Sequence, residues 1–260
     1  MNGLLQIFVS YKTSASDVST LEQCISMLDK SLVKTAIIVN DYRPDDPIAR
    51  LANPVDFFIP NSDNLGYGAT INRFVRSLQC MPEYLAFLNT DISWKVGTFE
   101  RSIDYMNQNY SCVLMVPKIL NPDQSLAYLC KRNPTFLALI SRRFIPNFLK
   151  SRALKKYDRW FCMQDSDYSN TIDCSYLSGC CMIVRSAPFI DLGGFDERFF
   201  LYLEDADLTR SMQKYGKCLH VPSLSIVHQW QRGSYRDLKL MYWNILSYFL
   251  YSSKWGWKLF

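Results

Sequence analysis

The chain has 260 residues, of which 48% are hydrophobic and 20% are charged, and its net charge is +5. This composition supplies a substantial apolar core for one large domain or two small ones, and the charge is too small to indicate nucleic acid as a partner. The nine cysteines form no CxxC pair. We therefore expect reduced, mostly buried thiols in a cytoplasmic protein.

The N-terminus and the apolar windows indicate no targeting or membrane-spanning segment. No basic region precedes the short apolar stretch at residues 4–9, so we expect no signal peptide. No window reaches the roughly 18 apolar residues that a membrane span needs. Any membrane association is therefore expected to be peripheral, on the inner face of the cytoplasmic membrane.

Short apolar runs alternate with amphipathic stretches in the first half of the chain. The pattern predicts helices between strands and so a Rossmann-like, mostly parallel α/β sheet with helices on both faces. Ligands bind such sheets at the carboxyl ends of the strands. Tyr11, Asp41, Asn64 and Asp91 follow predicted strands and are candidates for that edge. The predicted strands are residues 5–10, 35–39, 55–59, 84–88 and 112–116.

The segment 134–157 combines apolar and basic residues and contains no acid. Its basic residues include Arg142, Arg143 and Lys150. A basic amphipathic segment of this kind is typical of proteins that lie on an anionic membrane surface. The alternative is an ordinary helical insertion with a solvated basic face.

The tail, residues 231–260, holds three of the six tryptophans and several tyrosines and phenylalanines. It predicts an aromatic C-terminal helical extension that packs on the domain, on lipid, or on both. Residues 1–230 are expected to form the main domain, with 134–157 as an insertion.

Residues 193–208 read GGFDERFFLYLEDADL, and their end is the most informative part of the chain. Glu204, Asp205 and Asp207 follow an apolar run directly, and Leu208 and Met212 then recur at helical spacing. The acids therefore lie in the first turn of a helix, whose positive end favours negative charge. They indicate either a solvated, acid-capped helix start or a concave binding surface around the carboxylates. Asp207 is expected to face solvent or a neighbouring amide.

Five motifs occur in an order that resembles a known family. They are Asn61-x-x-Asn-Leu-Gly-Tyr-Gly68 with Asn72, then Leu-Asn-Thr-Asp91, then Ser178-Gly179, then the acidic stretch, then His228. Together they span roughly residues 4–230 and resemble family 2 glycosyltransferases with the GT-A fold. The nearest branch is the bacterial rhamnosyltransferase-like one, which builds surface polysaccharides such as O-antigen.

The resemblance implies a nucleotide-sugar site. Tyr11 and Asp41 stand where the family holds the base, although the usual Asp-Asn order is reversed here, so Asn40 and Asp41 both remain candidates. Asn64, Gly66 and Asn72 are expected to shape the nucleotide pocket. They are not part of a phosphate-binding GK[ST] loop, because none follows.

The resemblance also implies a metal site and a catalytic base. The family's Asp-x-Asp motif is Asn89-Thr-Asp91 here, so Asn89 is expected to contact the donor and Asp91 to bind the metal with His228. These ligands suit Mg²⁺ or Mn²⁺, with phosphate oxygens and water completing the shell. Asp205 resembles the family's base. Acceptor contacts are expected from Ser178, Gly179, Glu204, Trp230 and Arg232.

The resulting hypothesis is an inverting, metal-dependent hexosyltransferase. Its donor is expected to be a dTDP- or UDP-sugar, with dTDP-L-rhamnose as one candidate, and its acceptor a growing oligosaccharide on a polyprenyl diphosphate. One alternative is a sugar-nucleotide hydrolase or nucleotidyltransferase on a similar sheet. The other is a non-catalytic carbohydrate-binding protein with a decayed site, which the amide at Asn89 would favour.

Overall fold

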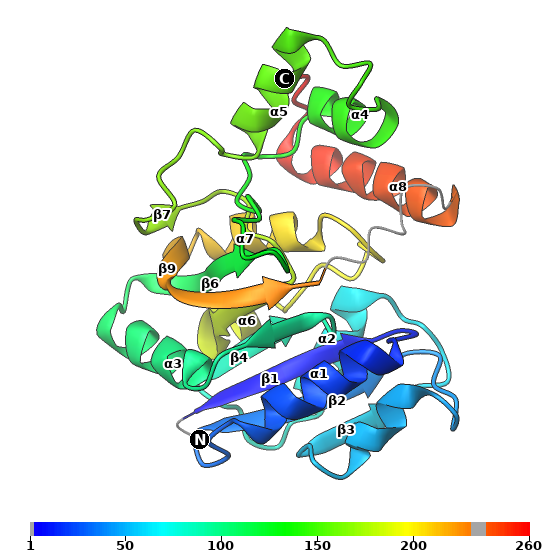
Figure 1. Ribbon diagram of the computed structural model, residues 1–260, viewed down its shortest axis with the longest axis vertical. Helices are drawn as coiled ribbons and strands as arrows, with labels where there is room; N and C mark the ends of the chain where they lie inside the picture. The colour runs from blue at the N-terminus through cyan, green and yellow to red at the C-terminus, as the bar shows by residue number, and fades with distance from the viewer. Residues whose placement is uncertain (1–2, 230–237) are drawn as a thin grey trace.

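The computed structural model describes residues 3–229 and 238–260. Its centre is a nine-stranded sheet with the order β3-β2-β1-β4-β8-β6-β9-β5, and β7 pairs with β9 (Figure 1). The fold is α/β, with a mostly parallel central sheet and helices, as the sequence predicts.

The first four strands of the sheet are parallel, with helices between them. Residues of alternating β1 positions enter opposite apolar cores, Leu4 and Phe8 on one face and Leu5 and Ile7 on the other. Both faces are therefore covered, which is the usual condition of a parallel sheet. The elements are β1 (Leu4–Ser10), α1 (Ala15–Ser26), β2 (Val33–Val39), η1 (Pro47–Ala52), β3 (Phe57–Pro60), α2 (Tyr67–Ser77) and β4 (Tyr84–Leu88).

The second half of the sheet mixes parallel and antiparallel pairs. β8 runs antiparallel to β4 and to β6, whereas β6 and β9 are parallel. The short β5 is antiparallel to β9, and Ile92 lies opposite His228. The elements are β5 (Ile92–Trp94), α3 (Thr98–Gln108), β6 (Cys112–Leu120), β7 (Ile172–Asp173), β8 (Cys181–Arg185), α6 (Ser186–Asp191), α7 (Glu204–Met212) and β9 (Lys217–His228).

The basic segment does not form one continuous surface helix. It forms α4 (Phe136–Phe144) and the beginning of α5 (Arg152–Phe161), which pack together. Asp158 holds them: it accepts hydrogen bonds from Ser141 Oγ and, at 2.6 Å, from Lys150 Nζ. The Lys150 side chain is only 7% exposed. Lys150 is therefore not part of an exposed basic face of this segment.

The C-terminal helix α8 (Leu238–Trp255) lies between the α4–α5 pair and the sheet (Figure 1). The chain end pairs with the start of α4, because Phe136 N and Leu137 N donate to the carbonyls of Lys258 and Leu259. Tyr248 and Tyr251 are buried, whereas Tyr242, Phe249 and Trp257 are exposed. The aromatic tail thus packs on the protein with part of its apolar surface and leaves the rest open.

Two further expectations can be compared with the structure. All nine cysteines are free thiols, and eight of them are buried. Within residues 3–229 and 238–260, no helix combines the length and apolar character that crossing a bilayer requires.

Candidate active site

Asp91 and His228 meet at one edge of the sheet. The antiparallel pairing of β5 with β9 brings them together, and His228 Nε2 lies 3.1 Å from Asp91 Oδ1. Gln229 N also donates to the Asp91 carbonyl, which fixes the chain on both sides of the pair. A carboxylate oxygen and an imidazole nitrogen so close together fit a divalent cation such as Mn²⁺. Among the described residues no group of three or more His, Cys, Asp or Glu side chains forms a complete protein shell.

A cavity of about 410 Å³ opens next to this pair. Its lining on the sheet side consists of Asn89, Asp91 and His228. The backbone N–H of Asn89 donates a hydrogen bond to the Cys180 carbonyl, which fixes its position. This volume is within the range of small-molecule sites. The first position of the expected metal motif is therefore an amide that still faces the same space as the acid. The other walls come from the loop around Lys131, from α4 and α5 (Ala138, Leu139, Arg142, Arg143, Phe161), from Tyr176, from the approach to α7 (Tyr202, Leu203) and from α8 (Asn244, Tyr248).

Asp205 lies directly behind this wall. Its Oδ2 accepts a hydrogen bond of 2.9 Å from Gly179 N, and its Oδ1 accepts one from Ala206 N. Tyr176 and Lys131, two residues of the cavity wall, lie close to Asp205. Burial raises the pKa of Tyr176, and the Asp205 charge raises it further. Burial lowers the pKa of Lys131, and the Asp205 charge offsets part of this shift. The Ser178-Gly179 turn thus holds the carboxylate, and it packs closely there, because a Cβ at Gly179 would lie 3.1 Å from Asp205 Cβ.

The approach to α7 is strained. Tyr202 and Leu203 both adopt left-handed backbone conformations, with φ of 70° and 62°. Such conformations are costly for side chains of this size and cluster at functional sites. Both residues line the cavity and immediately precede Glu204 and Asp205. The surrounding packing therefore imposes the direction in which these carboxylates point.

Glu204 differs from its neighbour in its surroundings. Its Oε2 is buried and has no hydrogen-bond partner among the described residues. Burial, together with the charge of Asp205, raises the pKa of Glu204 to about 8. Two adjacent carboxyls in a poorly solvated space do not both ionise readily. Glu204 therefore keeps its proton to higher pH than an ordinary glutamate, and in that form it offers a hydrogen-bond donor.

Of the two candidates for contact with the nucleobase, Asn40 is buried and Asp41 is accessible. Asn40 is 2% exposed, and its amide bonds Asn61, Asn64 and Thr70. Asp41 is partly exposed and sits in a left-handed turn with φ of 55°. The buried amide is already used in the loop, so the geometry favours Asp41 for contact with a ligand. Tyr11 is 47% exposed beyond the end of β1.

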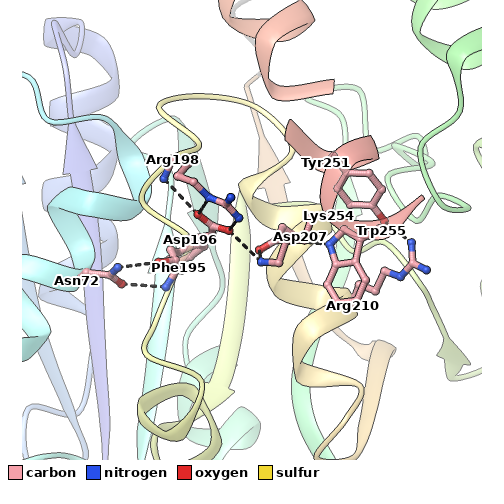
Figure 2. Close-up of polar contacts among 9 residues, drawn as sticks. All are labelled: Asn72, Phe195, Asp196, Arg198, Asp207, Arg210, Tyr251, Lys254 and Trp255. Carbon is pink, nitrogen blue, oxygen red and sulfur yellow. Dashed lines mark hydrogen bonds and ion pairs between the residues drawn. The ribbon is translucent and has the colours of Figure 1, made fainter. Parts of the chain in front are cut away.

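The side chains of the Asn64–Asn72 region are engaged in contacts within the protein. Asn64 Oδ1 accepts hydrogen bonds from Gly66 N and Asn40, so it shapes the turn. A Cβ at Gly66 would lie 2.6 Å from the Phe200 carbonyl oxygen, so the close approach is to the protein's own loop. Asn72 is buried and clamps Phe195 with two hydrogen bonds of 2.8 and 2.9 Å (Figure 2). Gly66 and Asn72 thus make close contacts with the protein's own 195–200 loop, and their part in shaping a nucleotide pocket stays a prediction.

Asp207 does not face solvent as the sequence predicts. Its side chain is 4% exposed and accepts hydrogen bonds from Lys254 Nζ at 2.9 Å and Trp255 Nε1 at 2.7 Å (Figure 2). Lys254 also bonds Asp196, which pairs with Arg198. The C-terminal helix thereby fastens both the loop before α7 and α7 itself. No local sequence pattern reveals these hydrogen bonds, because Lys254 and Trp255 lie 47 and 48 residues after Asp207 in the chain.

The remaining sequence-predicted residues are distributed as follows. Ser178 precedes the Gly179 turn and is partly exposed. Trp230 and Arg232, expected at the acceptor, lie outside the described residues. Sequence reasoning missed Lys131 and Tyr176, which stand in loops without periodicity. Arg142 and Arg143, which the sequence predicts on a membrane surface or on a solvated basic face, both line the cavity.

The mixed α/β sheet with this cavity at its strand ends has the GT-A fold of solved glycosyltransferase structures. Solved structures share this fold. The chain superposes on GalNAc-T7 with UDP, GalNAc and Mn²⁺ at a TM-score of 0.66 with 13% identity, over 98% of this chain and 48% of that one. It superposes on the Pyrobaculum calidifontis mannosyltransferase PcManGT with GDP-Man and Mn²⁺ at 0.58 with 11% identity, over 88% and 58%.

Sequence comparison leads to a narrower group. The chain is 27% identical over 189 residues to an N-acetylglucosaminyl-diphospho-decaprenol L-rhamnosyltransferase of Mycobacterium tuberculosis, covering 69% of this chain and 60% of that protein. It is 26% identical to the rhamnosyltransferase WbbL of Escherichia coli over 66% of this chain and 62% of that one. The chain thus spans about 60% of the length of these relatives. No protein-family model matches it. The resemblance to rhamnosyltransferase-like family 2 glycosyltransferases is confirmed.

Proposed function

We propose that this chain transfers a sugar from a nucleotide-sugar donor to a sugar carried on a polyprenyl diphosphate, with inversion at the anomeric carbon. The observation that carries the proposal is the Asp91–His228 pair in the cavity lining, with Asp205 close to the wall residues Tyr176 and Lys131 of the same cavity. The names of the relatives support dTDP-L-rhamnose as the donor and an N-acetylglucosaminyl diphosphate lipid as the acceptor. An intact Asp–His pair beside Asn89 argues against a decayed binding protein.

In the proposed mechanism, Asp91 and His228 hold a Mg²⁺ or Mn²⁺ ion. When bound, this cation neutralises the charge that grows on the diphosphate leaving group. Asn89 gives a hydrogen bond to the nucleotide sugar from the same edge of the sheet, and Asp41 accepts a hydrogen bond from an N–H of the nucleobase. Each of these contacts positions the donor without taking part in proton transfer.

Asp205 is the proposed general base. It takes the proton of the acceptor hydroxyl while that oxygen attacks the anomeric carbon from the side opposite the departing phosphate. Its backbone hydrogen bonds from Gly179 and Ala206 keep it oriented. Glu204, in its protonated form, donates a hydrogen bond to the acceptor and so orients it.

The direct test uses the purified chain with dTDP-L-rhamnose, a panel of UDP-sugars, Mn²⁺ and a short-chain N-acetylglucosaminyl diphosphate lipid. We expect a disaccharide product whose new linkage has the opposite anomeric configuration to the donor, detected by NMR. Free sugar released equally with and without acceptor would instead identify a hydrolase. Retained configuration would exclude Asp205 as the base of a single displacement.

We also propose that the enzyme works at the cytoplasmic face of a membrane. Exposed apolar side chains lie in the α4–α5 connection, where Phe148 is 82% exposed and Leu149 66%. Amphipathic surfaces with neighbouring basic residues bind anionic bilayers. Phe148→Ser with Leu149→Ser should weaken binding to vesicles containing anionic lipid, whereas Tyr110→Ser, an equally exposed aromatic on a distant surface, should not. Equal binding by all three proteins would exclude this segment.

A further inference from the structure

The helix α8 contributes a neutral wall to the active-site cavity. Of the described lining residues, those with charged side chains come from the sheet, from the loop around Lys131 and from α4. The lining residues of α8 are Asn244 and Tyr248, which lie about one helical turn apart on the same face. This wall therefore suits a neutral part of a ligand, whereas the charged walls suit its metal ion and phosphates.

The side-chain amide of Asn244 is available to a ligand. Within residues 3–229 and 238–260 it makes no hydrogen bond to another residue, and it is partly exposed at the cavity. Its neighbour on the same face differs, because Tyr248 Oη donates to the Lys258 carbonyl at 3.2 Å. An amide carries both N–H donors and a carbonyl acceptor, and such a group in a partly desolvated cavity is stabilised by a polar partner. Asn244 thus offers hydrogen bonds that the described part of the chain does not use.

Contacts before and after Asn244 fix its position. The ring of Trp243 stacks on that of Phe200, with the centroids 4.4 Å apart. Three residues after Asn244, Ser247 Oγ donates to the Leu201 carbonyl at 2.8 Å. Both contacts hold α8 against the segment that leads into α7. The amide is therefore placed beside the segment that precedes the proposed base.

Apolar side chains of α4 line the cavity beside this wall. α4 packs on α8 through Phe136 and Tyr248, whose ring centroids lie 6.1 Å apart (Figure 1). Ala138 and Leu139, which follow on α4, line the same cavity. The neutral side of the cavity therefore combines an unused amide with apolar surface. An N-acetyl substituent of a sugar presents the matching pair, an amide and a methyl group.

We propose that Asn244 determines acceptor specificity by binding the acetamido group of an N-acetylated acceptor sugar. This inference rests on the proposed function and names the residue that selects its acceptor. The Asn244 amide donates a hydrogen bond to the acetamido carbonyl, and the methyl group packs on the apolar side chains of α4. A sugar with a hydroxyl in place of the acetamido group leaves this apolar surface uncovered, so it binds less tightly.

The test compares Asn244→Ala and Asn244→Leu with a matched control, Gln108→Ala, which removes an exposed amide from α3 outside the cavity. Asn244→Ala removes the amide without adding volume, and an unchanged melting temperature shows that α8 stays in place. Calorimetric titration with N-acetylglucosaminyl diphosphate and with glucosyl diphosphate, in chelator and without donor, measures binding independently of turnover. We expect wild type and control to bind the N-acetylated sugar more tightly. Both Asn244 variants should bind it about 10- to 100-fold more weakly than wild type, with a nearly unchanged Kd for glucosyl diphosphate. Asn244→Gln should recover part of the loss.

The kinetic arm presents the same two sugars as alkyl diphosphates, with the nucleotide sugar and Mn²⁺. The Asn244 variants should lose the preference for the N-acetylated acceptor through KM, with kcat and the donor Kd unchanged. Three results would overturn the proposal: no preference in wild type, equal losses for both sugars in the variants, or a donor Kd that rises as much as the acceptor KM. Binding of the N-acetylated sugar that depends on Asn244, without transfer to either acceptor by wild type, would refute the proposed function instead and leave the acetamido site in place.

Discussion

The carboxylate of Asp207 accepts a hydrogen bond from the indole Nε1 of Trp255 at 2.7 Å, although the two residues are 48 positions apart. Asp207 lies two residues after the proposed base, on the same helix. The tail therefore supports the helix on which the proposed base lies, and Lys254 adds a second contact to the same carboxylate.

Asp207→Ala should destabilise the protein by about 2–3 kcal/mol, because it leaves two donors without their charged acceptor. Denaturant unfolding measures this directly. Asp104→Ala, at an exposed position of α3, is the control and should change the free energy of unfolding by less than about 0.5 kcal/mol. Equal effects of the two substitutions would show that the Asp207 contacts add little.

Gly194→Ala should be much more damaging than Gly193→Ala. Both glycines have φ near 85°, so both substitutions carry the left-handed penalty of about 1–2 kcal/mol. A Cβ at Gly194 would also lie 2.2 Å from Asn72 Oδ1, whereas a Cβ at Gly193 meets nothing within 4 Å. We expect an additional loss of about 1–3 kcal/mol for Gly194→Ala. Matching melting temperatures for the pair would contradict a tight Asn72 clamp.

Asp91→Ala and His228→Ala should each weaken the response to Mn²⁺, because both groups are proposed to hold the cation. Donor binding by calorimetry, with and without Mn²⁺, checks this, and Asp91→Ala should lose both donor affinity and metal response. His228→Ala should remain folded. An unchanged dependence of rate on Mn²⁺ in the His228 variant would assign that residue to structure alone.

Asp205→Asn should lower kcat by about 10²–10⁴-fold, because the amide cannot accept the proton. The amide oxygen can still accept the Gly179 hydrogen bond, so melting temperature and donor affinity should stay nearly unchanged. Glu204→Gln should be milder and act mainly on the acceptor KM. A folded Asp205→Asn variant with turnover within a few-fold of wild type would exclude Asp205 as the base.

Glu204 should make stability fall as pH rises. Its folded-state pKa of about 8 lies above the value of an unfolded glutamate, so the folded state holds a proton that the unfolded state has lost. The resulting loss in the free energy of unfolding is absent below about pH 4.5 and grows until the pH reaches about 8. Glu204→Gln should therefore raise the melting temperature relative to wild type at pH 8 but not at pH 4.5. A constant difference across this range would contradict a buried, protonated Glu204.

The sequence by itself determined the elements whose signals are local. Apolar runs ending in polar residues located β1, β2 and β4, and the spacing of Leu208 and Met212 placed the acids at the start of α7. The order of the motifs indicated the GT-A fold, because each motif is a short contiguous stretch. The position of Asp91 just after a strand was predicted for the same reason, because the strand and the polar residues after it are adjacent in the sequence.

Only the tertiary structure decided the roles that depend on distant partners. Asn72 looked like a ligand anchor but clamps Phe195, and Asp207 looked solvated but bonds Lys254 and Trp255. The arginines of α4 looked like a membrane-facing pair, yet packing of α4 against α5 and α8 turns them into the cavity. A polar residue has the same local pattern whether it meets solvent, a ligand or another helix. Which of these it meets is fixed by the packing of elements that are far apart in the chain.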